Sequence, residues 1–125
     1  MVSELYKKGL KIRKKVVGEE YVNKSLSQAD SFTEDFQELV TEFCWGSIWG
    51  RETLDPKIRS MLNIAMIAAL NRPHELRLHV QGALRNGVSQ DEIREVLLQL
   101  TVYAGVPAGV DSFRIAREAI ESYQE

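Results

Sequence analysis

The chain has 125 residues, of which 44% are hydrophobic and 27% charged, with 16 Lys and Arg against 18 Asp and Glu. This composition is typical of one soluble globular domain, here spanning residues 1–125, and excludes a disordered chain. The net charge of −2 provides no basic surface for nucleic acid or for an anionic membrane.

Cys44 is the single cysteine, which excludes a disulfide framework, a CxxC redox pair and a cysteine-only zinc site. With two histidines and no H-E-x-x-H spacing, the sequence predicts no metal site. The first residues do not have the form of a secretory signal, and the longest apolar run, 64–70, is far shorter than the ~20 residues of a membrane span. We therefore expect a cytoplasmic protein that binds neither nucleic acid nor membrane.

Hydrophobic periodicity predicts helices along nearly the whole chain. Ser3 caps a first helix, which ends at residues 16–18, and a short second helix covers residues 21–26. A third helix begins near Ser31, whose spacing to Glu34 fits a capping box. The apolar stripe of this third helix consists of Phe32, Phe36, Leu39, Val40 and Phe43.

Residues 44–54 are rich in glycine and tryptophan, and we interpret them as a connection. Asp55-Pro56 then begins a fourth helix that runs to about Asn71. Its part from 61 to 70 is apolar on nearly every side, with Asn63 as the one interruption. A helix that is apolar all round must be covered all round, and a short chain has few helices to do so. We therefore expect other copies of the chain to cover it in a homo-oligomer.

The second half of the chain carries clear helix boundaries. Arg72-Pro73 begins a fifth helix, which ends at Asn86-Gly87. A capping box at Ser89 begins a sixth helix that runs to Gly105, and Val106-Pro107 begins the last one. No segment alternates strictly between apolar and polar residues, so we predict no strand. The sequence predicts an all-α, single-domain bundle of about six to seven helices.

Glu75 and His79 are spaced i, i+4 on the fifth helix and therefore share a face, with His79 at the edge of the buried stripe. A carboxylate beside an imidazole raises the histidine pKa and fixes its tautomer, which suits proton transfer near neutral pH. The alternative is a structural pair at a helix interface, because such pairs are common.

Aromatic and cationic residues concentrate before and at the start of the apolar helix. Trp45, Trp49 and Arg51 lie close in sequence, and Arg59 follows. Aromatic walls with a cation suit a small anionic ligand, and arginine binds carboxylates in a bidentate geometry. Tyr103 can add a hydroxyl donor. The alternatives are core or subunit-interface packing for the tryptophans, ion pairs for the arginines and a protein partner for the tyrosine.

Eight short motifs occur in order along the chain. They are Tyr21-Val22-x-x-Ser25-Leu26, Phe36-Gln37-Glu38, Trp45-Gly46-x-Ile48-Trp49-x-Arg51, Arg59-Ser60-x-Leu62, Asn71-Arg72-x-x-Glu75-Leu76-x-Leu78-His79, Asn86-Gly87-Val88, Glu92-Ile93-x-Glu95-Val96 and Tyr103-x-Gly105-Val106-Pro107-Ala108. Together they resemble the carboxymuconolactone decarboxylase family, in particular its stand-alone γ-carboxymuconolactone (4-carboxymuconolactone) decarboxylases. The resemblance covers almost the whole chain.

This resemblance implies an alkyl-hydroperoxidase-like helical fold that assembles as a trimer-based hexamer. Redox members of that superfamily use a C-x-x-C-x-x-x-H motif. The histidine of the motif matches His79, whereas its two cysteines fall on Arg72 and Glu75 and a further acid falls on Ser60. The resemblance therefore implies a retained histidine position without the thiol chemistry.

The activity that the resemblance implies is decarboxylation of 4-carboxymuconolactone, or of a related lactone diacid, to 3-oxoadipate enol-lactone, as in protocatechuate catabolism. The carboxylate leaves from the γ-carbon and its electrons enter an extended dienolate, so no cofactor or metal is required. His79 with Glu75 then delivers the proton, and two cations hold the carboxylates of the small-molecule substrate. The substrate-binding residues are Arg51, Arg59, Trp45, Trp49 and Tyr103.

Three positions depart from the usual pattern of these decarboxylases. Glu52-Thr53 stands where Pro-Gly is usual, Val110 where Asn is frequent, and Pro73-His74 replaces the residues usually found before the glutamate. Two alternative functions therefore stay open. One is an alkyl-hydroperoxidase-like antioxidant without the CxxC pair, and the other is a non-catalytic oligomeric binder of small carboxylates.

Overall fold

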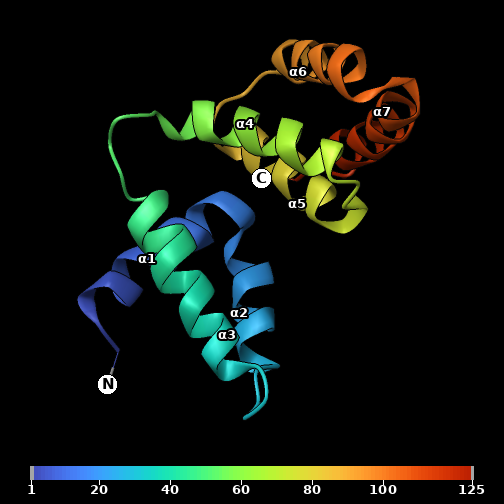
Figure 1. The fold of residues 1–125 in the computed structure, drawn as a ribbon. Helices are drawn as coiled ribbons and strands as arrows, with labels where there is room; N and C mark the ends of the chain where they lie inside the picture. Colours follow the sequence, from blue (N-terminus) through green and yellow to red (C-terminus); the bar gives the residue numbers. More distant parts are fainter. Residues whose placement is uncertain (1, 125) are drawn as a thin grey trace. The chain divides into compact units, whose positions relative to one another are not determined.

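Helices alone make up the regular structure of residues 2–124, the part of the chain that the computed structural model describes (Figure 1). That part contains no strand, which confirms the predicted all-α fold of six to seven helices. A π-helical segment, η1, continues α3 without a break. The elements are α1 (Glu4–Val17), α2 (Glu19–Ser27), α3 (Glu34–Leu39), η1 (Val40–Ile48), α4 (Pro56–Ala69), α5 (Pro73–Arg85), α6 (Gln90–Ala104) and α7 (Val106–Glu121).

The chain divides into two compact units, Met1–Asp55 and Pro56–Glu125. The first unit contains α1, α2, α3 and η1, and the second contains α4 to α7. Each unit has a hydrophobic cluster of its own. Two compact units can belong to one domain, so the single domain over 1–125 stays a prediction.

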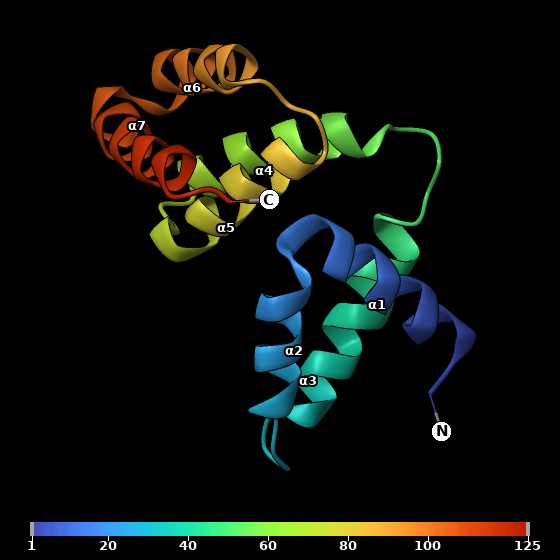
Figure 2. The ribbon, with the colours of Figure 1, turned by 180° about the vertical axis from the view of Figure 1, so that it is seen from behind.

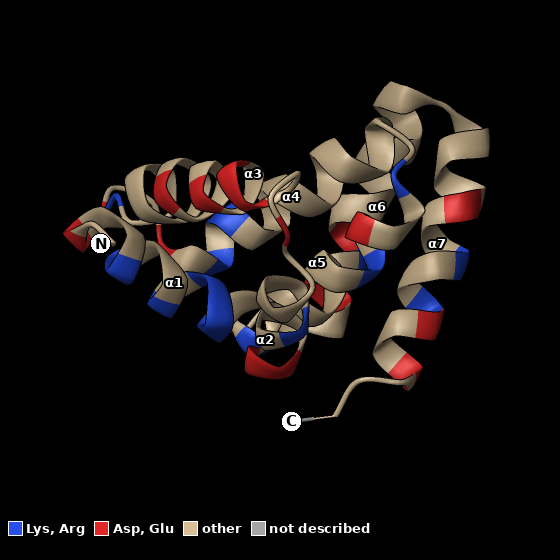
Figure 3. Cartoon of the chain, turned by 90° about the horizontal axis from the view of Figure 1, so that it is seen from below, with Lys and Arg blue, Asp and Glu red and all other residues tan. Residues whose placement is uncertain are grey.

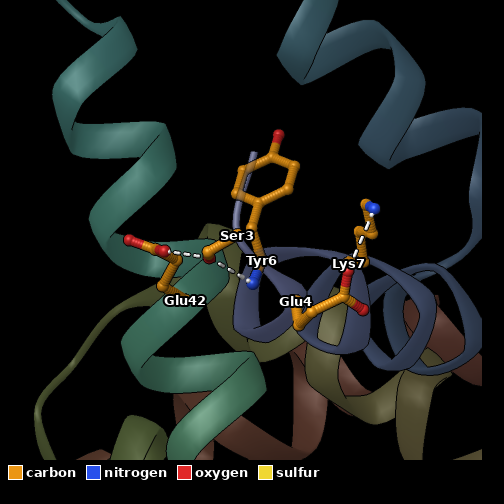
Figure 4. Close-up of polar contacts among 5 residues, drawn as sticks. All are labelled: Ser3, Glu4, Tyr6, Lys7 and Glu42. Atoms are coloured by element: carbon orange, nitrogen blue, oxygen red, sulfur yellow. Dashed lines mark hydrogen bonds and ion pairs between the residues drawn. The ribbon is translucent and has the colours of Figure 1, made fainter. Parts of the chain in front are cut away.

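In the first unit, Ser3 fixes the start of α1, as the sequence predicts. Its hydroxyl oxygen accepts a hydrogen bond from the backbone N–H of Tyr6 at 3.0 Å. The same hydroxyl donates to the carboxylate of Glu42 on η1, which ties the beginning of α1 to a second element (Figure 4). The helix ends at Gly18, whose φ of 96° is strained for any residue with a side chain.

Helices α1 and η1 pack so closely that their contact requires glycine. A Cβ on Gly9 would lie 1.9 Å from the carbonyl oxygen of Thr41 and 2.8 Å from the backbone nitrogen of Gly46. Beside this contact, Arg13 is buried and donates hydrogen bonds to Gln37 at 2.9 Å and to Thr41 at 3.2 Å. The guanidinium therefore links α1 to α3 and η1 inside the unit.

Two predicted boundaries in the first unit are wrong. The third helix begins at Glu34 instead of near Ser31, because the carboxylate of Asp30 accepts hydrogen bonds from the backbone N–H groups two and three residues on and holds a turn there. The segment 44–54 is not simply a connection, because η1 keeps the chain helical through Ile48.

In the second unit the predicted boundaries agree closely with the structure. Pro56 and Pro73 begin α4 and α5, which lie side by side in both views (Figures 1 and 2). Ser89 and Glu92 exchange the two hydrogen bonds of a capping box at 2.9 and 3.0 Å. Gly105, with φ 109°, separates α6 from α7. The fully buried aliphatic residues of this unit include Ile64, Leu76, Val80, Ile93 and Leu97.

One face of α4 packs in the second unit, and its opposite face is apolar and exposed. The buried side contains Ser60, Ile64 and Ala68. The opposite side, called the α4 outer face here, consists of Ile58, Leu62, Met66 and Leu70, which are 45%, 46%, 54% and 64% exposed. The prediction that the part from 61 to 70 is apolar on nearly every side is therefore confirmed. That other copies cover it stays a prediction.

Candidate functional site

The two predicted catalytic residues both lie on α5. Glu75 is exposed in the first turn, and His79 is half-buried one turn later. The imidazole Nδ1 of His79 lies 3.5 Å from Nδ2 of Asn63 on α4. In the tautomer that carries its proton on Nε2, the imidazole accepts a hydrogen bond from this amide through Nδ1. Helix α4 therefore orients the imidazole.

Burial sets the charge of His79. It lowers the pKa of the imidazole from 6.5 to about 4, and the carboxylate of Glu75 raises it by a smaller amount. The net rise in pKa expected from the Glu75–His79 pair is thus wrong, since removal of the imidazolium from water outweighs its attraction to the carboxylate. At neutral pH, His79 is an uncharged hydrogen-bond donor and acceptor.

Further polar groups surround the α4–α5 contact. Ser60 is fully buried on α4, and its hydroxyl accepts a hydrogen bond from Nδ2 of Asn86, the residue that ends α5, at 2.9 Å. Arg59 precedes Ser60 and lies one turn before Asn63 on α4. Its Nε is buried and has no hydrogen-bond partner among residues 2–124. An arginine nitrogen in that state is ready to donate to an anion.

The tryptophans and Arg51 belong to the first unit. The indole rings of Trp45 and Trp49 stack with centroids 4.9 Å apart and are 5% and 7% exposed. They pack in the hydrophobic cluster of that unit with Val16, among others. Arg51 follows as an exposed residue. The roles of these three residues toward a substrate stay predictions.

The remaining residues that the sequence singled out lie at different levels of exposure. Tyr103 is 83% exposed near the end of α6, and His74 and Arg72 are also exposed. Cys44 is partly buried, and burial raises the pKa of its thiol. A thiol with a raised pKa is a poor nucleophile near neutral pH, which disfavours the antioxidant alternative.

Asn63 and Asn86 are not among the predicted site residues. A signal for Asn63 existed, because it is the one polar interruption in the apolar segment 61–70. The sequence predicts for Asn86 only that it ends the fifth helix, and its position directly after α5 confirms this. The bond from its side chain to Ser60 spans 26 residues of sequence and has no local signal.

Across residues 2–124, no group of three or more His, Cys, Asp or Glu side chains is arranged to hold a metal ion. In the same range, no helix is long and apolar enough to cross a membrane. The candidate site in the second unit therefore combines the guanidinium of Arg59, the carboxylate of Glu75 and the neutral imidazole of His79 with amide and hydroxyl groups.

Comparison with known proteins identifies the family. A model of the Carboxymuconolactone decarboxylase family matches residues 34–118. The chain belongs to the carboxymuconolactone decarboxylase family. This confirms the resemblance and, with it, the alkyl-hydroperoxidase-like fold class. The matched range contains every candidate site residue in both units.

Two characterised relatives of this family member act on different compounds. The chain is 40% identical over 116 residues to 4-carboxymuconolactone decarboxylase of Acinetobacter baylyi, covering 93% of this chain and 87% of that protein. It is 42% identical over 116 residues to nitrosuccinic acid decarboxylase npaB of Metarhizium robertsii, covering 93% and 81%. Membership of the family therefore does not by itself fix the substrate.

Proposed function

We propose that this member of the carboxymuconolactone decarboxylase family decarboxylates a small dicarboxylate without a cofactor, with 4-carboxymuconolactone as the first candidate substrate. The observation that carries the proposal is the group of donors on α4 and α5. It combines Arg59 and its buried, unbonded Nε with the amide of Asn63 and the neutral imidazole of His79. Such groups can hold an anion and donate to a developing negative charge, which is what this reaction requires.

The named substrates of the two relatives share a skeleton. In 4-carboxymuconolactone and in nitrosuccinic acid, a carboxylate and a CH₂–COO⁻ group are attached to one carbon. That saturated carbon is attached to an electron acceptor, the unsaturated lactone carbonyl system in one compound and the nitro group in the other. Both compounds are therefore succinates with an electron acceptor at carbon 2. We infer that this class, rather than the lactone ring itself, is what the protein accepts.

The bond changes are equivalent in the two compounds. The bond from carbon 2 to its carboxylate breaks, CO₂ leaves, and the electron pair moves to an oxygen of the acceptor to give a dienolate or a nitronate. A proton then forms a C–H bond, at the lactone α-carbon or at carbon 2 of the nitro compound. We assign this proton to His79, and Glu75 favours its charged form. A bound dianion beside the imidazole raises its pKa, so substrate binding recruits the proton that the free protein lacks.

Arginine side chains hold the carboxylates in this proposal. The guanidinium of Arg59 presents Nε and a terminal nitrogen to the retained carboxylate in a bidentate geometry. The roles of Arg51 toward a second carboxylate, and of Trp45, Trp49 and Tyr103 as aromatic walls, stay predictions from the sequence.

The test measures CO₂ release from both compounds above the rate in buffer. Arg59→Met is expected to weaken substrate binding by about 10–150-fold, because a charge-assisted carboxylate contact contributes roughly 1.5–3 kcal/mol. Arg77→Met, which removes an exposed arginine of α5, is the matched control and should have little effect. If neither compound releases CO₂, the proposed activity is wrong. If analogues without the CH₂–COO⁻ group react equally well, the activity stands and the substrate class is wrong.

A further inference from the structure

The first unit presents an exposed apolar stripe. Phe32, Phe36, Leu39 and Phe43 are 92%, 60%, 60% and 60% exposed. Phe32 lies in the turn before α3, and the spacing of Phe36, Leu39 and Phe43 puts these three on one face of α3 and the beginning of η1. Single exposed apolar residues are common, but a continuous row with three phenylalanines marks a surface that is covered by a partner. We call this row the α3 stripe.

The α3 stripe is bordered by negative charge. Glu34, Asp35, Glu38 and Glu42 lie between or beside the apolar residues, and no lysine or arginine occurs between Asp30 and Glu42. Figure 3 shows the acidic residues as red bands along α3. At 100° per residue, Asp35 and Glu42 fall at one edge of the stripe. A partner for this surface therefore needs an apolar floor with a basic rim.

The second unit contains a groove of that kind between α6 and α7, with a volume of about 620 Å³. Its apolar side chains are Ile93 and Leu97 from α6 and Phe113 and Ile120 from α7. We call it the α6–α7 groove.

Arg94, Arg114 and Arg117 give the α6–α7 groove its positive charge, whereas Glu121 is its one acidic lining residue. Arg94 and Arg114 form ion pairs with carboxylates of their own helices at 3.2–3.9 Å, all of them exposed. Exposed pairs of this kind are weak and leave the arginines able to exchange partners. For Arg117, no ion pair is found among the described residues.

We propose that the α3 stripe of one copy docks in the α6–α7 groove of a second copy. The two surfaces match in both respects that govern such a contact: an apolar row with i, i+3, i+7 anchors meets an apolar floor, and an acidic border meets a basic rim. Because the stripe and the groove are different surfaces, the contact can repeat head-to-tail, and it forms a ring where the rotation between copies closes. This interface goes beyond the proposed activity and requires no substrate.

Charge reversal tests the interface by its effect on self-association. Glu34→Lys with Asp35→Lys and Glu38→Lys on α3, or Arg114→Glu with Arg117→Glu in the groove, should each raise the dissociation constant at least ~30-fold, as hot-spot changes do. Combining both sets in one chain should restore most of the affinity, because opposite charges face each other again. Glu19→Lys with Glu20→Lys on α2 is the matched control, since both glutamates are exposed and lie outside the stripe.

Cross-linking distinguishes a second copy from the same chain. In a Cys44→Ser background, one protein carries Phe36→Cys and the other Phe113→Cys, and the two are mixed with a short bis-maleimide. A cross-linked pair that contains one of each protein is expected. The proposal is overturned if that pair does not form, if the parent chain is monomeric, or if both charge-reversed variants associate as the parent does.

Discussion

Burial keeps the imidazole of His79 neutral although the carboxylate of Glu75 favours its charged form. The charge of this imidazole affects both the proposed activity and the stability of the protein. The imidazole Nδ1 lies 3.5 Å from the side-chain amide nitrogen of Asn63 on α4. Burial lowers the pKa of His79 to about 4, so near neutral pH the imidazole takes up a proton only when a new negative charge arrives. A doubly charged substrate supplies that charge, which couples substrate binding to protonation.

Replacing His79 by alanine is expected to lower turnover by ~10²–10⁴-fold, because a positioned general acid contributes about that much. Cys44→Ser should change turnover less than ~10-fold by the same comparison, since burial keeps this thiol protonated. Circular dichroism on both variants separates the loss of a proton donor from the loss of the fold. A larger effect of Cys44→Ser would contradict the role of His79 as proton donor, and an unfolded His79→Ala would assign His79 a structural role.

Acid is expected to destabilise the protein through His79. Its pKa is about 4 in the folded chain and 6.5 as the unperturbed value, so between these pH values the unfolded chain binds a proton that the folded chain does not. The free energy of unfolding therefore rises with pH across this window, by about 3 kcal/mol in total, and His79 adds no further pH dependence above it.

Urea unfolding across this pH range checks the acid effect. His79→Gln should lose this part of the pH dependence, whereas His74→Gln, which changes the exposed histidine of the same helix, should keep it. An unchanged pH dependence in His79→Gln would mean that burial does not control this imidazole.

The sequence could place Glu75 and His79 on one helix face because the i, i+4 spacing is local. It could not give the sign of the pKa shift, because the shift is set by burial of the imidazole, which depends on how the helices of this unit pack. The same limit applies to Ser60 and Asn86, whose hydrogen bond depends on how α4 packs against the end of α5.

At the scale of elements, helix ends could be predicted wherever local chemistry fixes them. Ser3, Pro56, Pro73 and Ser89 each act within one helical turn, and each prediction is confirmed. The prediction that residues 44–54 form only a connection was wrong for the opposite reason. Their glycines suggested that no helix continues there, whereas η1 runs through Ile48.

The glycine at position 46 in fact serves a packing contact. A Cβ there would lie 2.7 Å from the carbonyl oxygen of Leu5 on α1, so the residue lets two helices meet. This close approach is a tertiary requirement, which no local pattern in the sequence reveals.

The contact of α1 with η1 leads to a prediction about stability. Gly9→Ala would put a methyl group 1.9 Å from a backbone oxygen of η1, so the helices must separate. We expect a loss of about 1–3 kcal/mol in the free energy of unfolding, as for overpacked cores. Lys11→Ala, an exposed change on the same helix, should stay within about 0.5 kcal/mol. Chemical denaturation compares the two, and equal stabilities would show that the contact is looser than described.

At the scale of the whole molecule, a hexamer built from trimers needs two kinds of contact. One is head-to-tail and closes each ring, and the other is self-complementary and joins the rings. The α3 stripe and the α6–α7 groove are two different surfaces and suit the first kind. The α4 outer face is a single continuous apolar surface that can meet its own copy, and it suits the second kind.

Mutations should therefore disrupt each of the two contacts without disrupting the other. Leu62→Lys with Met66→Lys puts charges into the α4 outer face, where they would lose water without gaining partners. We expect the assembly to fall from six to three times the chain mass of 14.2 kDa, with the rings intact. Charge reversal on α3 should instead break the rings and leave pairs joined through α4. Gln99→Lys, an exposed change on α6, is the control. Size-exclusion chromatography with light scattering measures all four proteins, and a monomeric parent or an unchanged mass of the α4 variant would contradict this architecture.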